Sequence, residues 1–324
     1  MGVRLLRIHK GGDVIGIEVQ GRFGNQLFQY AAARIAAERL GCGLVVHQRR
    51  VGRRRLLSLL GTNRVAAEIG DKFPLVTQSR AGIVLQTMRE TMPAPAYQRL
   101  KDRLFPKKFE PRCVVVCGVP GVEIFDRDFE SVTRGTWLSG YFQSSQYFSG
   151  YEADIQKWFS LSKSAEGEVE RLVRTFPAPR ERMVAIHIRR TDYLTQRDCI
   201  SHPTLGWALP LDYYHNALKA LPGGLRHAVF SDDPQFAAGA FSSVDPWISV
   251  GSDPVTDLFL MSRCRYMIIA NSSLSWWAAW LNSDLEKVVI APRYHVGWYV
   301  GIWYPSGSDV PSWNYITVSR PPIL

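Results

Sequence analysis

The stretch Val14-Ile-Gly-Ile-Glu-Val19, followed by Gly21-Arg-Phe-Gly24 and then by Asn25–Leu40, decides the fold. β-Branched residues predict a strand over 14–19, and the two glycines predict a tight loop after it. Apolar residues recur at helical spacing within 25–40, which predicts a helix that ends at Gly41. A second strand is expected at 44–46, and further strands are expected at 114–119 and 136–140. Strand, glycine loop, helix and strand form a βαβ unit, which predicts a parallel sheet.

The second half of the chain alternates strands with short helices from Met183 to Ile290, beginning with a strand at 183–188 and including a helix at 234–240. Such alternation is typical of a doubly wound α/β sheet, whose ligands bind at the carboxyl ends of the strands. A chain of 324 residues has the length of about two domains, and Pro177–Arg182 has the composition of a linker. We therefore expect two Rossmann-like α/β domains facing a cleft, 1–177 and 178–324, with a C-terminal tail that packs back.

Composition excludes several classes of protein. Hydrophobic residues make up 46% and charged residues 21% of the chain, as in globular and unlike disordered proteins. No apolar run approaches the ~18 residues of a membrane span, and the first residues lack the apolar core of a signal peptide. The five cysteines are an odd, sparse set without zinc-like spacing, which predicts buried, reduced thiols. These features favour a cytoplasmic protein.

The excess of 39 Lys and Arg over 29 Asp and Glu gives a net charge of +10, which indicates an anionic partner. Nucleic acid, an acidic membrane face and a phosphorylated small substrate all fit this charge. Part of it lies in two basic clusters, Arg49–Arg55 and Lys101–Lys108, for which a solvated surface is an equally good interpretation. Neither cluster alternates with aromatic residues as a nucleic-acid platform does, so we expect no nucleic-acid partner.

Three stretches that follow predicted strands carry candidate functional residues. In the first, Gly21-Arg-Phe-Gly-Asn-Gln26, the glycines allow backbone N–H groups to approach an anion at the start of a helix. Ordinary turn chemistry is the more common role of two such glycines, and Asn25 also fits a plain N-cap. This stretch alone therefore leaves both interpretations open.

The second stretch, His187-Ile-Arg-Arg-Thr-Asp-Tyr193, follows a buried strand. Two adjacent arginines and an aspartate at a strand exit are unfavourable unless they meet a ligand or one another. Guanidinium groups match diphosphate oxygens, and their charge does not depend on pH. We favour an anion site over the alternative, an Arg–Asp ion pair that holds the loop.

The third stretch, Ala270-Asn-Ser-Ser-Leu-Ser-Trp-Trp277, places hydroxyl and free N–H groups at a helix start, which also suits an anion. Trp276, Trp277 and Trp280 are interpreted as core packing rather than sugar stacking. The chain has no Walker A motif, no G-x-G-x-x-G fingerprint and no carboxylate cluster suited to a metal. Two anion sites across a cleft, without a metal motif, suggest a nucleoside diphosphate bound without a cation.

Six stretches in a fixed order span most of the chain: Gly21–Tyr30, Leu138–Gln143, His187–Tyr193, Leu211–Tyr214, Phe230–Pro234, and Asp257 through Trp277. Together they resemble the motifs of glycosyltransferase family 11, the α1,2-fucosyltransferases, in their bacterial form. The arginine motif alone is shared with other fucosyltransferases that use GDP-fucose.

This resemblance implies a GT-B fold, GDP-fucose as the donor substrate, and inversion at the anomeric carbon without a metal ion or other cofactor. The first domain would be the acceptor side, and the second would bind GDP-fucose. Arg189 and Arg190 would hold the pyrophosphate, Ser272 and Ser273 would cap it, and Asp232 would lie near the nucleoside. By position in the motifs, the other donor-binding residues are Gly24, Asn25, His187 and Asn271.

The implied acceptor is a galactose-bearing glycan that receives fucose on its 2-hydroxyl. An inverting transfer needs that hydroxyl deprotonated as it attacks, usually by a carboxylate near the donor. Asp192 lies two residues after Arg190, and Asp198 lies on the segment expected to face the acceptor, so both join Arg189 as candidate catalytic residues. His187 lies within the strand and is a poorer candidate. Contact with the inner membrane would be peripheral, through the basic clusters.

Two other functions fit part of the pattern. An α1,6-type fucosyltransferase acting on a chitin-like or core saccharide shares the arginine motif, although the Asn271–Trp277 stretch argues against it. A basic carbohydrate- or nucleic-acid-binding protein with a transferase fold is the non-enzymatic alternative, because a fold does not imply an activity. Retention of Asn25, both arginines and Asp192 makes this alternative the weaker one.

Overall fold

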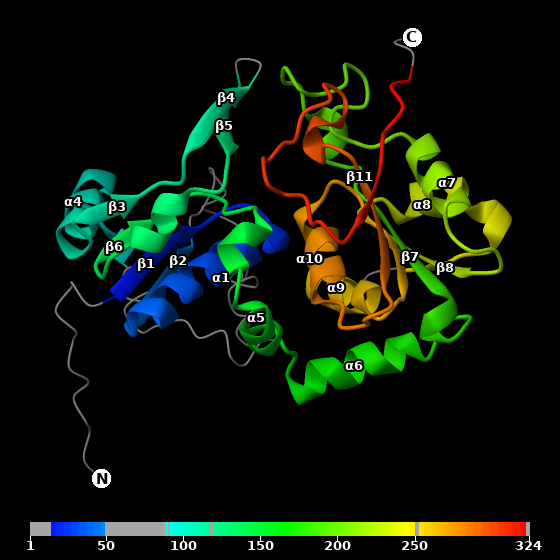
Figure 1. Ribbon diagram of the computed structural model, residues 1–324, viewed down its shortest axis with the longest axis horizontal. Helices are drawn as coiled ribbons and strands as arrows, with labels where there is room; N and C mark the ends of the chain where they lie inside the picture. The colour runs from blue at the N-terminus through cyan, green and yellow to red at the C-terminus, as the bar shows by residue number, and fades with distance from the viewer. Residues whose placement is uncertain (1–13, 49–87, 90, 117–118, 250–252, 322–324) are drawn as a thin grey trace. The chain divides into compact units, whose positions relative to one another are not determined.

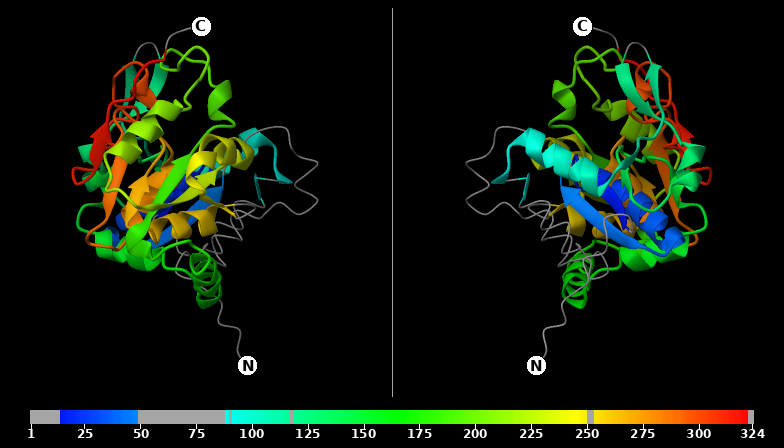
Figure 2. Two further views of the ribbon diagram at one scale, coloured as in Figure 1. Left: turned by 90° about the vertical axis from the view of Figure 1, so that its right-hand side faces the viewer. Right: turned by 90° about the vertical axis from the view of Figure 1, so that its left-hand side faces the viewer.

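The computed structural model describes residues 14–48, 88–89, 91–116, 119–249 and 253–321, so the basic cluster Arg49–Arg55 lies outside the described residues. The chain divides into two compact units (Figure 1; two further views of the ribbon are given in Figure 2). Each is an α/β unit with its own parallel sheet, which confirms the expected GT-B-like organisation. The first contains Met1–Arg112, Phe125–Phe142 and Tyr147–Phe159, and the second contains Cys113–Ile124, Gln143–Gln146 and Ser160–Leu324.

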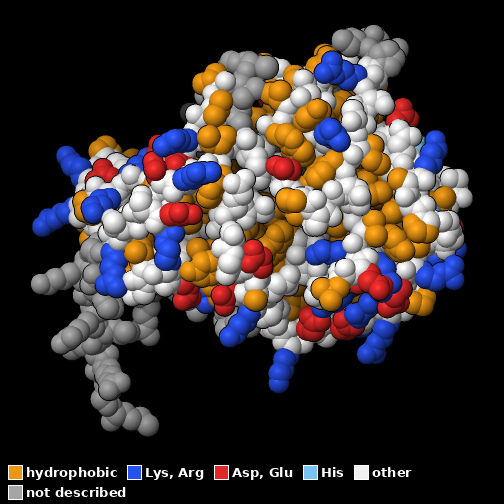
Figure 3. Space-filling view, in the orientation of Figure 1, with side chains coloured by type: hydrophobic (Ala, Val, Ile, Leu, Met, Phe, Trp, Pro, Cys, Tyr) orange, Lys and Arg blue, Asp and Glu red, His pale blue; other side chains and the backbone are white. Residues whose placement is uncertain are grey.

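The division after Phe159 lies earlier than the predicted boundary at residue 177. The helix α6 (Lys163–Val173) is held in the second unit by ion pairs. Arg263 Nε lies 3.3 Å from Glu170 Oε1, and Arg263 Nη2 also pairs with Glu166. Acidic and basic side chains are accordingly interspersed in the region of α6 (Figure 3). The proline-containing stretch after α6 is therefore a connection within the second unit.

The described sheet of the first unit consists of β1 (Val14–Val19), β2 (Gly43–Gln48), β3 (Lys107–Phe109) and β6 (Thr136–Leu138), all parallel. Their order is β2-β1-β6-β3, so the strand order reverses between β1 and β6. The motif stretch at 138–143 leaves β6 at that point, and the glycine loop leaves β1 there. The accompanying helices are α1 (Phe23–Leu40), α4 (Ala94–Leu104) and α5 (Glu152–Trp158).

The βαβ opening forms as predicted, with α1 starting two residues earlier than expected. Gly41 ends α1 in the left-handed conformation, at φ 57°. On β1, Gly16 leaves no room for a side chain, because a Cβ there would lie 2.4 Å from the Trp137 ring. The indole of Trp137 packs edge-on against Phe105, with ring centroids 4.5 Å apart. This close packing attaches α4 and its flanking residues to one face of the sheet.

Five side chains near the carboxyl end of this sheet form what we call the Glu18 cluster: Glu18, His47, Arg89, Tyr97 and Lys101. Glu18 lies 3.1 Å from Arg89 Nη1 and 3.3 Å from Lys101 Nζ. His47 Nδ1 lies 3.6 Å from the same carboxylate, and His47 Nε2 is 3.4 Å from the Tyr97 hydroxyl. Burial raises the pKa of Glu18, but the adjacent His47 and the cations Lys101 and Arg89 lower it by more, so that it falls to about 2.

The described residues of the second basic cluster do not form one solvated surface. Lys101 is buried in the Glu18 cluster, with Nζ 4.5 Å from the centre of the Trp137 ring. Lys107 donates a hydrogen bond to Thr133, and the exposed Lys108 pairs with Glu110. The cluster in the sequence is therefore divided between the interior and locally paired surface positions.

The second unit is built on the strands β7 (Met183–Ile188), β8 (Arg226–Ser231), β9 (Trp247–Ile248), β10 (Tyr266–Ile268), β11 (Val288–Pro292) and β12 (Asn314–Ile316), all parallel. Their order is β12-β11-β10-β7-β8-β9. The chain runs outward from β7 to β9 on one side and from β10 to β12 on the other, which is a doubly wound sheet. Besides α6, the helices are α7 (Leu211–Lys219), α8 (Pro234–Ala240), α9 (Pro254–Ser262) and α10 (Ser273–Leu281).

Three segments differ from the sequence prediction. The strand expected at 114–119 is an antiparallel hairpin of β4 (Cys113–Val116) and β5 (Val119–Glu123), because an unbroken apolar run does not show where a chain reverses. The short strands β3 and β12 were not predicted. Near the C-terminus, β12 pairs with β11 of its own unit, and the packing back of the tail stays a prediction.

Two packing predictions have different outcomes. Trp276 and Trp277 are buried side by side, as expected for core residues. Among the described cysteines, which are all free thiols, Cys264 is buried but Cys113 and Cys199 are exposed, so the expected burial is wrong for these two. No helix in the described part of the chain is both long and apolar enough to cross a membrane.

Candidate functional site

The candidate site lies in the second unit, where the strand order reverses between β7 and β10. Ligands of open parallel sheets bind outside the carboxyl ends of the strands at such a point. The arginine stretch leaves β7 there, and Asn271–Ser273 follows β10. Tyr193 joins the two segments, because its hydroxyl donates a hydrogen bond to the carbonyl oxygen of Asn271 at 3.0 Å. Two of the three predicted stretches therefore converge.

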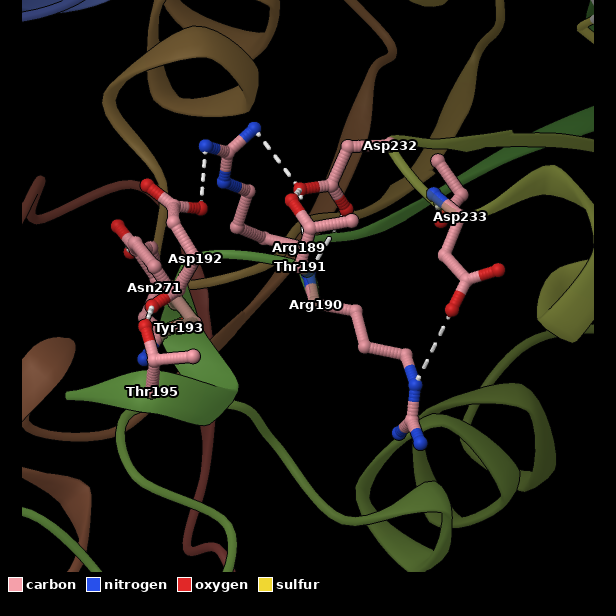
Figure 4. A network of polar contacts seen from close by, with 10 residues as sticks. Arg189, Arg190, Thr191, Asp192, Tyr193, Thr195, Asp232, Asp233 and Asn271 are labelled. Carbon is pink, nitrogen blue, oxygen red and sulfur yellow. Dashed lines mark hydrogen bonds and ion pairs between the residues drawn. The ribbon is translucent and has the colours of Figure 1, made fainter.

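Arg189 lies between two carboxylates at this point (Figure 4). Its Nη2 is 2.5 Å from Asp192 Oδ1, and its Nη1 is 3.1 Å from Asp232 Oδ2. The Arg189 side chain is 12% exposed, so its charge would be unfavourable without such partners. The Arg–Asp ion pair that the sequence analysis gave as the alternative to an anion site is thus present. It engages the Arg189 guanidinium, which is the group best suited to bind an anionic ligand.

Asp232 is held by the loop that carries the arginines. Its Oδ1 accepts a hydrogen bond from the Arg190 N–H at 2.8 Å, and its Oδ2 accepts one from the Thr191 N–H at 3.2 Å and another from the Thr191 hydroxyl. Burial raises the pKa of Asp232, but the Thr191 hydrogen bond and the Arg189 charge lower it by more. The net result is a pKa below the usual range of an aspartate. The resemblance placed Asp232 near the nucleoside, whereas its carboxylate here is engaged by the arginine loop.

The parallel register of β7 and β8 explains why Asp232 meets Arg189. Ile188 pairs with Ser231, so the next residue of each strand emerges beside the other at the same edge of the sheet. Both motifs were recognised in the sequence, but their pairing was not predicted. A prediction that β7 and β8 are parallel neighbours, with Ile188 opposite Ser231, would have placed Asp232 beside Arg189.

Arg190 points away from Arg189 (Figure 4). Its Nε lies 3.4 Å from Asp233 Oδ2, and its guanidinium lies 3.6 Å from the centre of the Phe236 ring. Consecutive side chains of an extended segment point to opposite sides. The two guanidinium groups therefore do not form one fork, and a contact of Arg190 with the pyrophosphate stays a prediction.

His187 lies within β7 and is 4% exposed. Burial and the charge of Arg189 lower its pKa to about 3, although Asp232 opposes this shift. Its Nδ1 has no hydrogen-bond partner among the described residues. The imidazole is therefore neutral at physiological pH and contributes no positive charge to a donor site.

The start of α10 offers backbone groups to the same region. Ser272 is the N-cap and its side chain makes no capping hydrogen bond, while Ser273 is the first helical residue. Asn271 is fully buried, and its Nδ2 donates a hydrogen bond to the carbonyl oxygen of Trp207 at 2.8 Å. A helix start without a side-chain cap suits an anion. Donor contacts by these three residues stay predictions, and Asn271 meanwhile braces the Trp207 segment.

Asp198 lies on the connection between β7 and α7. Its Oδ1 accepts hydrogen bonds from the Ile200 N–H at 3.2 Å and from the Trp207 indole at 3.3 Å. Trp207 in turn packs edge-on against Tyr193, with ring centroids 5.6 Å apart. The carboxylate thus organises its own loop, and its role as a base stays a prediction.

The predicted residues Gly24 and Asn25 belong to the first unit, in the first turn of α1. Arg22 is the N-cap of α1, so the N-cap interpretation of Asn25 is wrong. Gly21 has φ 78°, and a Cβ there would lie 2.6 Å from Asn25 Nδ2, so this turn requires glycine. Contact of Gly24 and Asn25 with a donor stays a prediction. Across the described residues, no group of three or more His, Cys, Asp or Glu side chains is arranged to hold a metal ion.

The family model of glycosyl transferase family 11 matches residues 132–297, half of the chain. The chain belongs to this family. The matched segment includes the arginine loop, Asp232 and the start of α10. The protein is therefore a glycosyltransferase, and the family resemblance drawn from the sequence is confirmed.

Two Escherichia coli proteins are related in sequence. The O-antigen biosynthesis glycosyltransferase WbnK is 27% identical over 308 residues, which cover 87% of this chain and 94% of WbnK. An alpha-1,2-colitosyltransferase is 30% identical over 164 residues, which cover 47% of this chain and 53% of that protein.

Two solved fucosyltransferase structures share limited similarity with the chain. POFUT1 in complex with GDP-fucose has a TM-score of 0.46 at 14% identity, covering 88% of this chain and 99% of POFUT1. The fucosyltransferase NodZ from Bradyrhizobium has a TM-score of 0.44 at 15% identity, covering 82% of this chain and 93% of NodZ.

Proposed function

We propose that the protein is an inverting α1,2-fucosyltransferase that moves L-fucose from GDP-fucose to the 2-hydroxyl of a terminal galactoside. The observation that carries this proposal is the position of Arg189 at the reversal of strand order, on a loop whose Tyr193 is hydrogen-bonded to Asn271, just before the uncapped start of α10. A diphosphate is the ligand that suits a buried guanidinium beside a helix start. Membership of family 11 makes that diphosphate part of a sugar donor.

The chemistry of an inverting transfer agrees with this arrangement. As the sugar departs, positive charge develops on the anomeric carbon and negative charge on the leaving diphosphate. Arg189 and the N–H groups of α10 would stabilise the leaving group, and such fixed electrostatic contacts are commonly the largest part of catalysis. The proposal therefore includes no metal ion or other cofactor.

Asp192 is the proposed catalytic base, because its carboxylate pairs with Arg189 and the residue stands at the start of the loop leading to Trp207, where its backbone carbonyl oxygen accepts a hydrogen bond from the Thr195 hydroxyl. The first unit is proposed as the acceptor side. The relatives support a saccharide acceptor, since one is named for O-antigen biosynthesis and the other for transfer of colitose in an α1,2 linkage. Colitose is accordingly the second candidate sugar. Any contact with a membrane would be peripheral.

Thermal unfolding with a panel of nucleotide sugars tests the donor. We expect GDP-fucose to raise the melting temperature more than GDP-mannose or UDP-galactose at equal concentration, because only ligands that bind the folded state stabilise it. Stronger protection by GDP-colitose would replace fucose with colitose, and stronger protection by UDP-galactose would contradict the guanine donor.

The linkage needs a separate experiment. A β-galactoside incubated with the best donor should give a product whose NMR spectrum shows substitution at the 2-hydroxyl. A 6-linked product would instead support the α1,6-type alternative, and steeply salt-dependent DNA binding without any transfer would support the non-enzymatic one.

A further inference from the structure

We propose that the diphosphate of the donor displaces Asp192 from Arg189, so that donor binding itself releases the carboxylate that serves the acceptor. This inference rests on the proposed function, because it takes a nucleoside diphosphate as the ligand of Arg189. It adds a second state of the site, in which Arg189 exchanges one anionic partner for another. The order of events follows: the donor binds first, and the base becomes available second.

Both Nη groups of Arg189 already have an anionic partner. Nη1 pairs with Asp232 at 3.1 Å and Nη2 pairs with Asp192 at 2.5 Å. A guanidinium binds a phosphate through two parallel N–H groups, and each such pair of N–H groups includes at least one Nη atom. A diphosphate bound in that way has to compete with one of the two carboxylates. Two anions at one nitrogen repel each other strongly in a partly buried site, so one of them leaves.

The two carboxylates are not equally easy to displace. Removing Asp232 would leave the partly buried N–H group of Arg190 without its acceptor, and it would also break the more exposed hydrogen bond from the Thr191 N–H. A partly buried N–H group without an acceptor is unfavourable. The Asp192 side chain is 35% exposed against 18% for Asp232, and it lies on the short turn that follows the strand. Asp192 is therefore the partner that leaves, and Asp232 keeps Arg189 in place.

Release of Asp192 also makes its carboxylate available to the acceptor. In the transfer, the acceptor oxygen bonds to the anomeric carbon while the bond from that carbon to the diphosphate oxygen breaks. GDP leaves with the electron pair, and the acceptor proton passes to Asp192. The carboxylate would thus be released from Arg189 only when the leaving group is present.

The variant Asp192→Asn separates this exchange from a structural ion pair. It keeps the shape of the side chain but removes the competing charge. Calorimetry should show GDP binding about threefold to tenfold more tightly than to the wild type, the range expected for the loss of one competing ion pair. Binding of guanosine, which has no phosphate, should be unchanged. Transfer should fall below about one hundredth of the wild-type rate, as expected for loss of a general base.

The matched control is Asp284→Asn, which breaks an ion pair with Arg265 at 3.0 Å in the same unit. It should leave the GDP affinity unchanged. If Asp192→Asn binds GDP no more tightly than the wild type while melting at the same temperature, Asp192 orients Arg189 and the proposed exchange is wrong.

A crystal structure of the wild-type protein with GDP gives a second, direct measurement. A diphosphate oxygen should then occupy the position next to Arg189 Nη2 that Asp192 Oδ1 holds in the structure described above. Persistence of the Arg189–Asp192 contact beside bound GDP would overturn the exchange alone. Absence of any binding of GDP or GDP-fucose to the wild type would overturn the proposed function, and this inference with it.

Discussion

The Glu18 cluster and the Arg189 site both place charged side chains near the carboxyl end of a parallel sheet. They differ in which sign of charge is in excess, because basic groups outnumber the carboxylate in the first and carboxylates outnumber the guanidinium in the second. In the first unit, the single carboxylate of Glu18 contacts Arg89, Lys101 and the imidazole of His47. In the second unit, the single guanidinium of Arg189 contacts two carboxylates. One region thus surrounds an anion with cations, and the other surrounds a cation with anions.

The difference distinguishes a structural cluster from an exchangeable one. Glu18 is held by groups from β2, α4 and the segment before α4, so the loss of any contact would disturb packing between elements. Asp192 is three residues from Arg189 in the chain, so their ion pair joins two residues of one loop rather than two packed elements. Buried charges need partners in both regions. In the second region, the proposed donor replaces one of these partners.

The largest effect should come from the centre of the exchangeable site. Arg189→Ala should lower kcat by at least about a hundredfold, the scale seen when one donor to a developing negative charge is removed. It should also weaken GDP binding. Arg189→Lys should restore little, because an ammonium group cannot reproduce the two-donor fork. Steady-state kinetics and calorimetry measure both quantities.

Arg190→Ala is the informative companion variant. Since its guanidinium packs on Phe236 and points away from Arg189, we expect a smaller loss of transfer. Equal losses for the two arginines would show that they act as one fork after all. Near-normal turnover of Arg189→Lys would show that Arg189 has a structural role. The Arg189 site and the Glu18 cluster would then both be structural groups of charges.

The next effect concerns stability and the first region. The pKa of Glu18 falls from 4.5 to about 2 in the folded protein. This shift stabilises the fold by about 3 kcal/mol above about pH 4.5, and the contribution is lost as the pH falls toward 2. Glu18→Gln should therefore lower the free energy of unfolding by about this amount at pH 7, as measured with urea, and by less than half of it at pH 3. GDP binding should be unaffected. An equal loss at both pH values would show that packing, rather than charge, is responsible.

The comparison also shows what the sequence could and could not predict. The strand, glycine loop and helix at 14–40 follow local patterns, and so do the β7 and α8 bounds, which were predicted without error. The candidate residues Arg189, Asp192 and Asp232 came from motifs, but their mutual contacts depend on strand register. The Glu18 cluster was missed because its members are far apart in the chain, and Lys101 had been grouped with its basic sequence neighbours.

A smaller effect is expected from His187, which is buried without charge. Its pKa of about 3 in the folded protein lies below the 6.5 of an ordinary histidine. Protonation of the unfolded chain therefore lowers stability as the pH falls from about 6.5 toward 3. His187→Gln removes this dependence, so its free energy of unfolding should fall less than that of the wild type between pH 7 and pH 5. Parallel curves for both proteins would show that His187 carries a proton in the fold.

The smallest effect should come from Asp198, the other carboxylate proposed as a base. Its Oδ1 receives hydrogen bonds from the Ile200 N–H and the Trp207 indole, so the side chain already has a structural task within its loop. Asp198→Asn keeps an oxygen that can accept these bonds. We expect the KM for the acceptor to rise by a few-fold at most, with kcat and GDP affinity close to those of the wild type. If kcat instead falls about a hundredfold while Asp192→Asn remains active, the base is Asp198. Release of Asp192 would then have no catalytic purpose, and Arg189 would differ from the Glu18 cluster only in how it binds the donor.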